Sequence, residues 1–331
     1  MKNVLGIGNA LVDVMKMLPD DGIVNELGFS KGSMTLVDEE TSGKIKDSTR
    51  DIETTLASGG SAANTMHGLA MMGMDAGFIG SVGNDEAGDF FEADMRKAGV
   101  NTYLLRRKTV TGTAVAMVSR DSERTFGTHL GAAVELSGRD IKENLLTGYD
   151  ILYLEGYLIT NRDLVVTACK NARKQGIKVA IDMASFNVVE EFKEDFRYLI
   201  SNYVDIVLAN EDEARAFTGK EPFEALGELS SLCEIAVVKI GSEGSYIKRG
   251  EEVIKVETIN VKSLDTTGAG DLYAAGFLYG LCLDEDLDKC GAYGSILAGN
   301  VIEVVGPKMD KERWGRIFKQ IETVKKGEIL K

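Results

Sequence analysis

The second half of the chain alternates short apolar runs with helical stretches, and this alternation limits the fold more than any other feature. Strands that are apolar on both sides and joined by helices are typical of a parallel sheet with both faces covered. The sequence therefore predicts an α/β fold with a doubly wound, mostly parallel sheet and helices on both faces. The apolar runs cover residues 151–154, 179–181, 206–208 and 235–239, and the helical stretches cover 161–175, 189–202 and 211–218.

Polar residues and glycines follow these strands, at the edge where such a sheet binds its ligands. Each one alone is weak evidence, because acids and glycines are common in turns. In the expected topology they converge on one edge of the sheet, which makes them candidates for a common site. They are Asp182, Asn210, Glu213, Lys239, Gly241 and Gly244.

The string Asp-Thr-Thr-Gly-Ala-Gly-Asp at 265–271 stands between a strand-like alternation at 257–261 and an apolar helical stretch at 269–282. The first N–H groups of a helix have no helical partner and form an anion site. Gly268 and Gly270 let a ligand approach the backbone closely. The helix dipole favours an ionised Asp271, the form that a general base needs. Alternatively, Asp265 or Thr267 only caps the helix and the glycines form a tight turn.

A short apolar run at 4–7 leads into a polar segment that contains Asn9 and Asp13. The pair Gly6-x-Gly8 suggests a dinucleotide fingerprint, but the third glycine of that pattern would fall on Leu11, which disfavours a nicotinamide-dependent dehydrogenase. The segment then offers Asn9 and Asp13 to a polar ligand, or Asp13 is simply a buried or turn-capping residue.

A second glycine-rich turn, at 58–64, leads into a helix. Gly59 and Gly60 permit close approach of the backbone to a ligand, and Asn64 falls in the first helical turns. Ser61 stands between them. We expect the Asn64 amide to face the same ligand as the glycine turn, although a capped helix with a solvated asparagine fits the pattern too.

The composition excludes several classes of protein. The chain has 331 residues and a net charge of −14, so a nucleic-acid backbone or an anionic membrane is an unfavourable partner. No apolar run is long enough to cross a membrane, and the first residues make a poor signal peptide. None of the four cysteines forms a C-x-x-C pair, which is typical of a reduced, cytoplasmic protein.

The motifs together resemble the PfkB, or ribokinase-like, carbohydrate kinases. The glycine turn with Gly73 and Gly83 is similar to the first family signature, and 265–271 is similar to the second. Asn210-x-x-Glu213 and Lys239-x-Gly241-x-x-Gly244 resemble two further family motifs, in the same order. The resemblance spans nearly the whole chain and implies one ribokinase-like domain at 1–331. Met66 and the run 124–132 resemble the adenosine-kinase-like branch.

The resemblance also implies roles for individual residues. The catalytic set is Asp271, which takes the proton of the acceptor hydroxyl, with the amides of Gly268, Ala269 and Gly270. The substrate-binding set is Asn9, Asp13, Gly59, Gly60, Ser61 and Asn64. The nucleotide-binding set is Asn210, Lys239, Gly241, Gly244 and Ser295, and Glu213 organises Mg²⁺. Relatives often have Asn or His where Ser295 stands, Lys239 could equally lie on the surface, and Asn210 and Glu213 could only begin a helix.

A small β-sheet lid is implied for the segments at about 14–57 and 102–129. Residues 14–57 are mostly irregular and polar, with one apolar patch at 34–37, whereas 102–129 alternates like strands. Met34, Leu36 and Phe126 are candidates for an apolar wall against a nucleoside base.

The expected activity is transfer of the ATP γ-phosphoryl group to a primary hydroxyl of an adenosine-like nucleoside, with Mg²⁺ as cofactor. A sugar kinase acting on ribose, fructose or a related sugar is the alternative, and a non-catalytic ligand-binding protein of the same fold is a weaker one. The expected partners are small molecules, without nucleic acid or membrane. Dependence on a monovalent cation such as K⁺, and the choice between monomer and homodimer, stay open.

Overall fold

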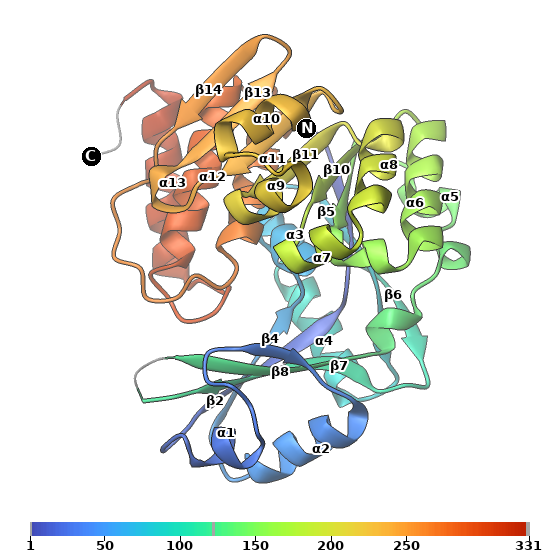
Figure 1. The fold of residues 1–331 in the computed structure, drawn as a ribbon, viewed down its shortest axis with the longest axis vertical. Helices are drawn as coiled ribbons and strands as arrows, with labels where there is room; N and C mark the ends of the chain where they lie inside the picture. The colour runs from blue at the N-terminus through green and yellow to red at the C-terminus, as the bar shows by residue number, and fades with distance from the viewer. Residues whose placement is uncertain (1, 121–122, 329–331) are drawn as a thin grey trace.

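The computed structural model describes residues 2–120 and 123–328. In these residues a large sheet carries helices on both faces, and a smaller sheet stands apart at the bottom of Figure 1. The strands of the large sheet run in the order β14-β13-β12-β11-β10-β9-β1-β5-β6. They are parallel except for β13, which is antiparallel to both neighbours. In chain order they are β1 (Val4–Ile7), β5 (Ala76–Gly83), β6 (Asn101–Arg107), β9 (Ile151–Glu155), β10 (Lys178–Asp182), β11 (Ile206–Asn210), β12 (Ile235–Lys239), β13 (Ser245–Arg249) and β14 (Glu252–Val256).

The smaller sheet mixes parallel and antiparallel pairs in the order β3-β8-β7-β2-β4. Its strands are β2 (Leu11–Met17), β3 (Met34–Leu36), β4 (Thr54–Gly59), β7 (Thr111–Val118) and β8 (Arg124–Gly131). Strand β2 follows β1 after only three residues, so the chain passes directly from the large sheet into the small one. In β2, Asp13 lies between Ala57 of β4 and Ala114 of β7.

The helices cover the large sheet in two layers. One hydrophobic core joins the sheet to α3, α4, α11, α12 and α13, and the other joins it to α6, α8, α9 and α10. Alternate residues of a strand point to opposite layers, so Val4 belongs to the first core and Leu5 to the second. The helices are α1 (Gly22–Glu26), α2 (Glu39–Ser48), α3 (Ser61–Met71), α4 (Glu86–Lys97), α5 (Glu143–Leu146), α6 (Arg162–Lys174), α7 (Phe186–Glu191), α8 (Lys193–Tyr203), α9 (Glu211–Thr218), α10 (Pro222–Ser230), α11 (Ala269–Cys282), α12 (Leu287–Val301) and α13 (Lys311–Lys325).

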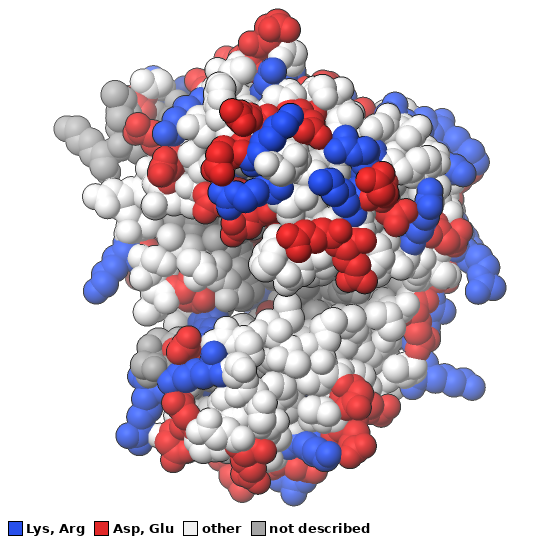
Figure 2. Space-filling view, in the orientation of Figure 1, with Lys and Arg blue, Asp and Glu red and all other residues white. Residues whose placement is uncertain are grey.

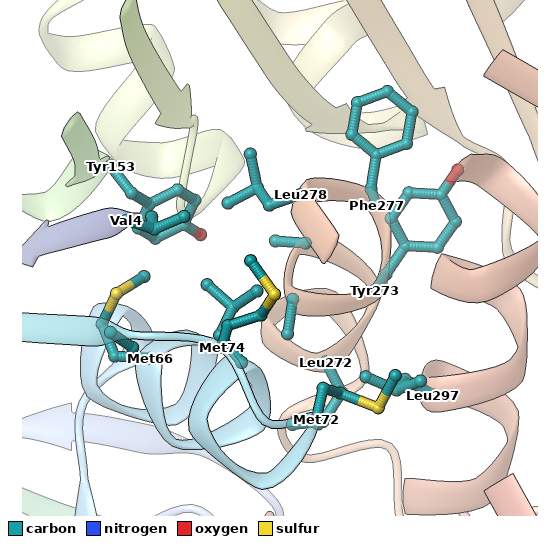
Figure 3. Close-up of a cluster of buried hydrophobic side chains, with 14 of the residues drawn as sticks. Val4, Met66, Met72, Met74, Tyr153, Leu272, Tyr273, Phe277, Leu278 and Leu297 are labelled. Atoms are coloured by element: carbon teal, nitrogen blue, oxygen red, sulfur yellow. The ribbon is translucent and has the colours of Figure 1, made fainter. Parts of the chain in front are cut away.

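Helix α11 lies in the middle of the first core, because it is apolar on nearly every side. Figure 3 shows Leu272, Phe277 and Leu278 of this helix close to side chains of α3 and the sheet, Met66 and Tyr153 among them. The absence of a side chain at Gly276 lets the backbone of α12 come close to α11. This packing fixes the N-terminus of α11 at the edge where the parallel strands end.

The alternating pattern predicted the centre of the large sheet well, and three expectations were wrong. Residues 257–261 form no strand; Ile259 alternates because its side chain packs against α12 at Gly299. The helix expected at 189–202 is two helices that break at Phe192. Residues 102–107, which we expected in the small sheet, belong to β6 and pair with β5 in the large one.

The segment 14–57 is more regular than its polar composition suggested. It contributes most of β2 together with α1, β3, α2 and β4. Helix α2 is held by an Asp38 cap that accepts from the Thr41 amide, and its buried Ile45 lies against the small sheet at Gly127. The existence of a small sheet here is therefore clear, whereas its motion as a lid stays a prediction. Among the described residues, no helix is long and apolar enough to span a membrane.

Candidate active site

A cavity of about 790 Å³ lies between the carboxyl ends of the parallel strands and the small sheet. In Figure 2 the surface around the hollow between these two parts is largely uncharged. The cavity brings together most of the residues that the sequence singled out, although they come from distant parts of the chain. Those that line it are Asn9, Asp13, Gly60, Ser61, Asn64, Glu213, Lys239, Gly268, Gly270 and Asp271.

Asp271 lies in the first turn of α11, with its carboxylate held by α3. Ser61 Oγ donates to its Oδ1 at 2.7 Å and Asn64 Nδ2 donates to its Oδ2 at 3.0 Å. Burial raises the pKa of Asp271 to about 6, against the opposing effect of these two hydrogen bonds. The Asn64 Oδ1 atom is buried without a partner among the described residues. Asp271 is thus a desolvated carboxylate that is ionised at neutral pH.

The loop before α11 is shaped by Asp265. Its Oδ1 accepts from the Thr267 amide at 3.1 Å and from the Thr267 hydroxyl at 2.8 Å, and its Oδ2 accepts from the Gly306 amide at 2.6 Å. Arg124, from β8 of the small sheet, forms a buried ion pair with the same carboxylate at 2.6 Å. The loop is therefore tied both to the segment that follows α12 and to the small sheet.

Of the three amides expected to form the anion site, one is already engaged. The Ala269 N–H donates to the Thr266 carbonyl at 3.1 Å, whereas the N–H groups of Gly268 and Gly270 have no partner in the described part of the chain. Gly268 has φ +77°, the left-handed conformation that glycine adopts without strain. Two open amides at a helix N-terminus make this loop suited to an anion.

A buried lysine lies beside these amides. Lys239 Nζ pairs with Asp182 Oδ2 at 2.7 Å, and a Cβ built on Gly270 would come within 3.3 Å of that Nζ. Although burial disfavours the ammonium, Asp182 and Glu213 raise the pKa of Lys239 above its ordinary value. The alternative of a surface lysine is therefore wrong, because the side chain is only 14% exposed.

Asn210 and Glu213 form a reciprocal cap at the start of α9. The Asn210 side chain accepts from the Glu213 amide at 2.8 Å, and both oxygens of Glu213 accept from Asn210, each at 2.7 Å. Glu213 is buried, and burial together with nearby Asp182 raises its pKa. No group of three or more His, Cys, Asp or Glu side chains suited to a metal ion occurs in 2–120 and 123–328.

A buried carboxylate organises the opposite end of the cavity. Glu155, at the end of β9, accepts from Asn9 Nδ2 at 2.6 Å and from the Ala62 amide at 3.1 Å. Burial raises its pKa to about 7. Gly60 has φ +100°, and a side chain there would strike the Asn9 carbonyl. These contacts fix the glycine turn against the end of β1.

Asp13 faces this end of the cavity without a donor. In the described residues, neither of its carboxylate oxygens accepts a hydrogen bond, and burial raises its pKa to about 7. Gly59 lies directly against that carboxylate, so a side chain at 59 would displace it. An unpaired, desolvated carboxylate facing a cavity is an acceptor for ligand hydroxyls.

Some expected site residues lie outside the cavity lining. Ser295 is buried within α12, and Gly241 and Gly244 form the turn between β12 and β13 with φ of +53° and +98°. Their contact with a nucleotide stays a prediction. Sequence reasoning gave no role to Glu155 or Arg124, and it named Asp182 only as a candidate at the strand ends, without a specific role. The signal for Glu155 was its position directly after an apolar strand.

Comparisons with known proteins agree with this geometry. The family model described as "pfkB family carbohydrate kinase" matches residues 33–313. An uncharacterised sugar kinase of Archaeoglobus fulgidus is 30% identical, over 73% of this chain and 96% of that protein. A 5-dehydro-2-deoxygluconokinase of Bacillus subtilis is 29% identical, over 74% and 80%.

Two solved structures are similar over nearly their whole length. The adenosine kinase of Sinorhizobium meliloti has a TM-score of 0.86 and 34% identity, covering 96% of this chain and 99% of that one. A probable sugar kinase of Rhizobium etli has a TM-score of 0.87 and 32% identity, covering 99% of both. The chain therefore belongs to the pfkB family of carbohydrate kinases, phosphotransferases whose acceptor is an alcohol group.

Proposed function

We propose that the protein transfers the γ-phosphoryl group of ATP to the primary hydroxyl of an adenosine-like nucleoside. The observation that carries the proposal is the place of Asp271, a buried carboxylate fixed by Ser61 and Asn64 beside the open amides of Gly268 and Gly270. A base and an anion site in one cavity are what transfer of a phosphoryl group to an alcohol requires.

In the reaction, the acceptor oxygen forms its bond to phosphorus, the bond to the leaving phosphate oxygen breaks, and the hydroxyl proton passes to Asp271. General-base assistance of this kind contributes about 10²–10⁴ in rate. The Gly268 and Gly270 amides donate to the phosphoryl oxygens as charge develops on them. Lys239 adds a fixed positive charge on the same side, because its ammonium lies against Gly270.

A divalent metal ion with ATP goes with this family, and Mg²⁺ is the ion that we propose. It supplies positive charge on the phosphate oxygens when bound. Glu213 and Asp182 fit such an ion as a carboxylate pair, since Asp182 lies close enough to Glu213 to raise its pKa. Asn210 holds Glu213 in place. We also propose that Asn210, Lys239, Gly241, Gly244 and Ser295 surround the nucleotide.

A wall of apolar side chains supports a nucleoside acceptor over a free sugar. Met34, Leu36 and Phe126 of the small sheet line the cavity, and Met34 and Leu36 are 57% and 64% exposed. Large apolar groups left open toward a cavity favour a ligand with an apolar face, such as a base. Asp13 and Asn9, at the other end, suit the ribose hydroxyls. Closure of the small sheet over both would exclude water from the reaction.

A sugar kinase is the alternative, supported by the names of the relatives from Archaeoglobus fulgidus and Bacillus subtilis. The test is an acceptor screen with ATP and Mg²⁺, in which nucleosides, free sugars and sugar acids are compared by product mass. We expect a nucleoside 5′-monophosphate. Phosphorylation of free sugars alone would contradict the nucleoside assignment while leaving the kinase assignment intact.

The proposal also places the enzyme in the cytoplasm and leaves its oligomeric state and its dependence on a monovalent cation to experiment. Cys169, Cys233, Cys282 and Cys290 are all free thiols, and burial raises the pKa of each to about 12, which suits a reduced cytoplasm. Gel filtration would separate a monomer from a homodimer. Assays with K⁺ replaced by tetramethylammonium would show whether a monovalent cation takes part.

A further inference from the structure

The ammonium group of Lys308 is buried near the substrate end of the cavity without a hydrogen-bond partner. Its Nζ atom is closed off from solvent, and no residue of 2–120 or 123–328 accepts from it. An isolated buried ammonium is unfavourable unless nearby charges compensate for its lost hydration. The charges around Lys308 must therefore explain why it is there.

The position of Lys308 is fixed by the two residues before it. The Gly306 amide donates to Asp265 at 2.6 Å, and Pro307 lies so close to Gly268 that a Cβ built on that glycine would be 2.7 Å from the proline ring. The segment 306–308 is thus anchored to the loop that forms the anion site.

The same segment also touches the substrate strand. A Cβ built on Gly306 would be 3.4 Å from the Met15 side chain, and Met15 shares one side of β2 with Asp13, two residues away. Segment 306–308 therefore bridges the anion loop and the strand that carries Asp13, and Lys308 lies at the end of that bridge.

Three carboxylates stabilise the buried ammonium: Asp94 of α4, Asp13 of β2 and Asp271 of α11. Burial lowers the pKa of Lys308 to about 8, and these three act in the opposite direction. His67 of α3 also faces this group, but burial lowers its pKa to about 3, so it is neutral at neutral pH.

Two of the three carboxylates have donors of their own. Asp94 accepts from the Ser58 amide at 3.0 Å and from the Ser58 hydroxyl at 2.7 Å, and Asp271 accepts from Ser61 and Asn64. Asp13 alone has no donor among the described residues. Lys308 therefore supplies compensating positive charge to the one carboxylate of the three that has no donor of its own and is left free to bind a ligand.

We propose that Lys308 is a positioning residue for the acceptor: its ammonium keeps Asp13 in the carboxylate form that accepts hydrogen bonds from two neighbouring hydroxyls of the substrate. The inference rests on the proposed kinase function, and it holds for any acceptor that carries such a pair, nucleoside or sugar. Lys308 acts through Asp13 and does not line the cavity itself.

The proposal has a definite dependence on pH. Burial raises the pKa of Asp13 to about 7, Lys308 and Arg124 lower it, and Asp271 raises it further. The carboxylate form exists above this pKa, so acceptor binding weakens as the pH falls through it. Loss of the Lys308 charge raises the pKa of Asp13, which moves the loss of binding to higher pH.

The test is the acceptor KM and kcat of Lys308→Met, Lys308→Gln and Lys308→Arg between pH 6 and 9, at saturating ATP. Both uncharged variants should raise KM at pH 7 by about fivefold, which follows from a rise of about one unit in an Asp13 pKa that starts at about 7, and KM should approach the wild-type value at pH 9. Lys308→Arg should keep the wild-type profile within about threefold. Lys311→Met, which removes an exposed lysine three residues away, is the matched control and should change nothing.

A rise in KM that is the same at every pH would mean that Lys308 is merely structural and would overturn the proposal, as would an unchanged KM in a folded uncharged variant. In an Asp13→Asn background, Lys308→Met should cause no further rise in KM, because the two act as one unit. A full additional rise would also overturn it. The chemical nature of the acceptor tests the proposed function, whereas the pH dependence of its KM tests Lys308.

Discussion

Replacing Asp271 with asparagine removes the proposed base while keeping the shape of the side chain. Ser61 can still donate to the remaining carbonyl oxygen. The new amide would face Asn64 Nδ2, but Asn64 can turn over and offer its Oδ1, which has no partner in the described residues. The fold should therefore tolerate Asp271→Asn, so a loss of activity can be assigned to chemistry.

The expected loss follows from the role of a general base. Without one, kcat should fall by about 10²–10⁴, which corresponds to about 3–5 kcal/mol in the barrier. The acceptor KM should change by less than about threefold, since the variant loses an interaction of the transition state. Product formation from ATP and acceptor, followed by mass spectrometry over hours, covers this range. A variant that keeps more than a tenth of the wild-type kcat would refute the assignment.

Stability supplies an independent check on the same residue. Burial raises the pKa of Asp271 from 3.8 to about 6. Because the folded state holds this proton more tightly, the wild type loses stability as the pH rises from about 4 to about 6, on the order of 3 kcal/mol. Asp271→Asn lacks this loss. Its free energy of unfolding, measured by urea denaturation and taken relative to that of the wild type, should therefore increase from pH 4 to pH 8. Parallel stability curves for the two proteins would show that Asp271 is not desolvated as described.

Three further predictions concern the surrounding residues. Lys239→Met should lower the free energy of unfolding by about 3–5 kcal/mol in urea titrations, because it leaves buried Asp182 unpaired. Lys174→Met breaks an exposed pair and should cost under about 1 kcal/mol, so equal losses in the two variants would contradict the buried pair. Gly60→Ala should lower Tm clearly and raise the acceptor KM through strain at φ +100°, and Gly43→Ala, with open space around it, should not; a Gly60→Ala variant that melts like wild type would contradict the close turn. Phe126→Ala should raise KM for nucleosides by about tenfold, equivalent to about 1.4 kcal/mol of lost contact, and should leave KM for any sugar unchanged. An equal effect on both classes of acceptor would contradict the proposal that Phe126 packs against a base.

The sequence predicted the centre of the fold because the relevant signals are local. Strands such as β9 and β12 are buried on both faces, so each is a continuous apolar run that needs no knowledge of its neighbours. Helix α11 was also predicted to its ends, since glycines and a carboxylate mark its start. The break at Phe192 and the irregular backbone at 257–261 were not predictable, because they depend on tertiary packing.

The site was predictable where its chemistry depends on residues close together in sequence. Asp271 and the Gly268–Gly270 backbone belong to one helix start, that of α11, and Ser61 and Asn64 belong to another, that of α3. The residues that bind Glu155 and Lys239, and the carboxylates around Lys308, come from distant segments of the chain. Periodicity carries no information about such contacts. For Ala269, the hydrogen bond to Thr266 depends on the detailed shape of the turn.

The most direct test of the account is a crystal structure with adenosine and a non-hydrolysable ATP analogue. The account predicts that the ribose 5′-oxygen lies within hydrogen-bond distance, about 2.6–3.2 Å, of the Asp271 carboxylate, with ribose hydroxyls on Asp13 and the base against Phe126. A nucleoside whose 5′-oxygen points away from Asp271, or an analogue whose terminal phosphate lies far from Gly268 and Gly270, would contradict it.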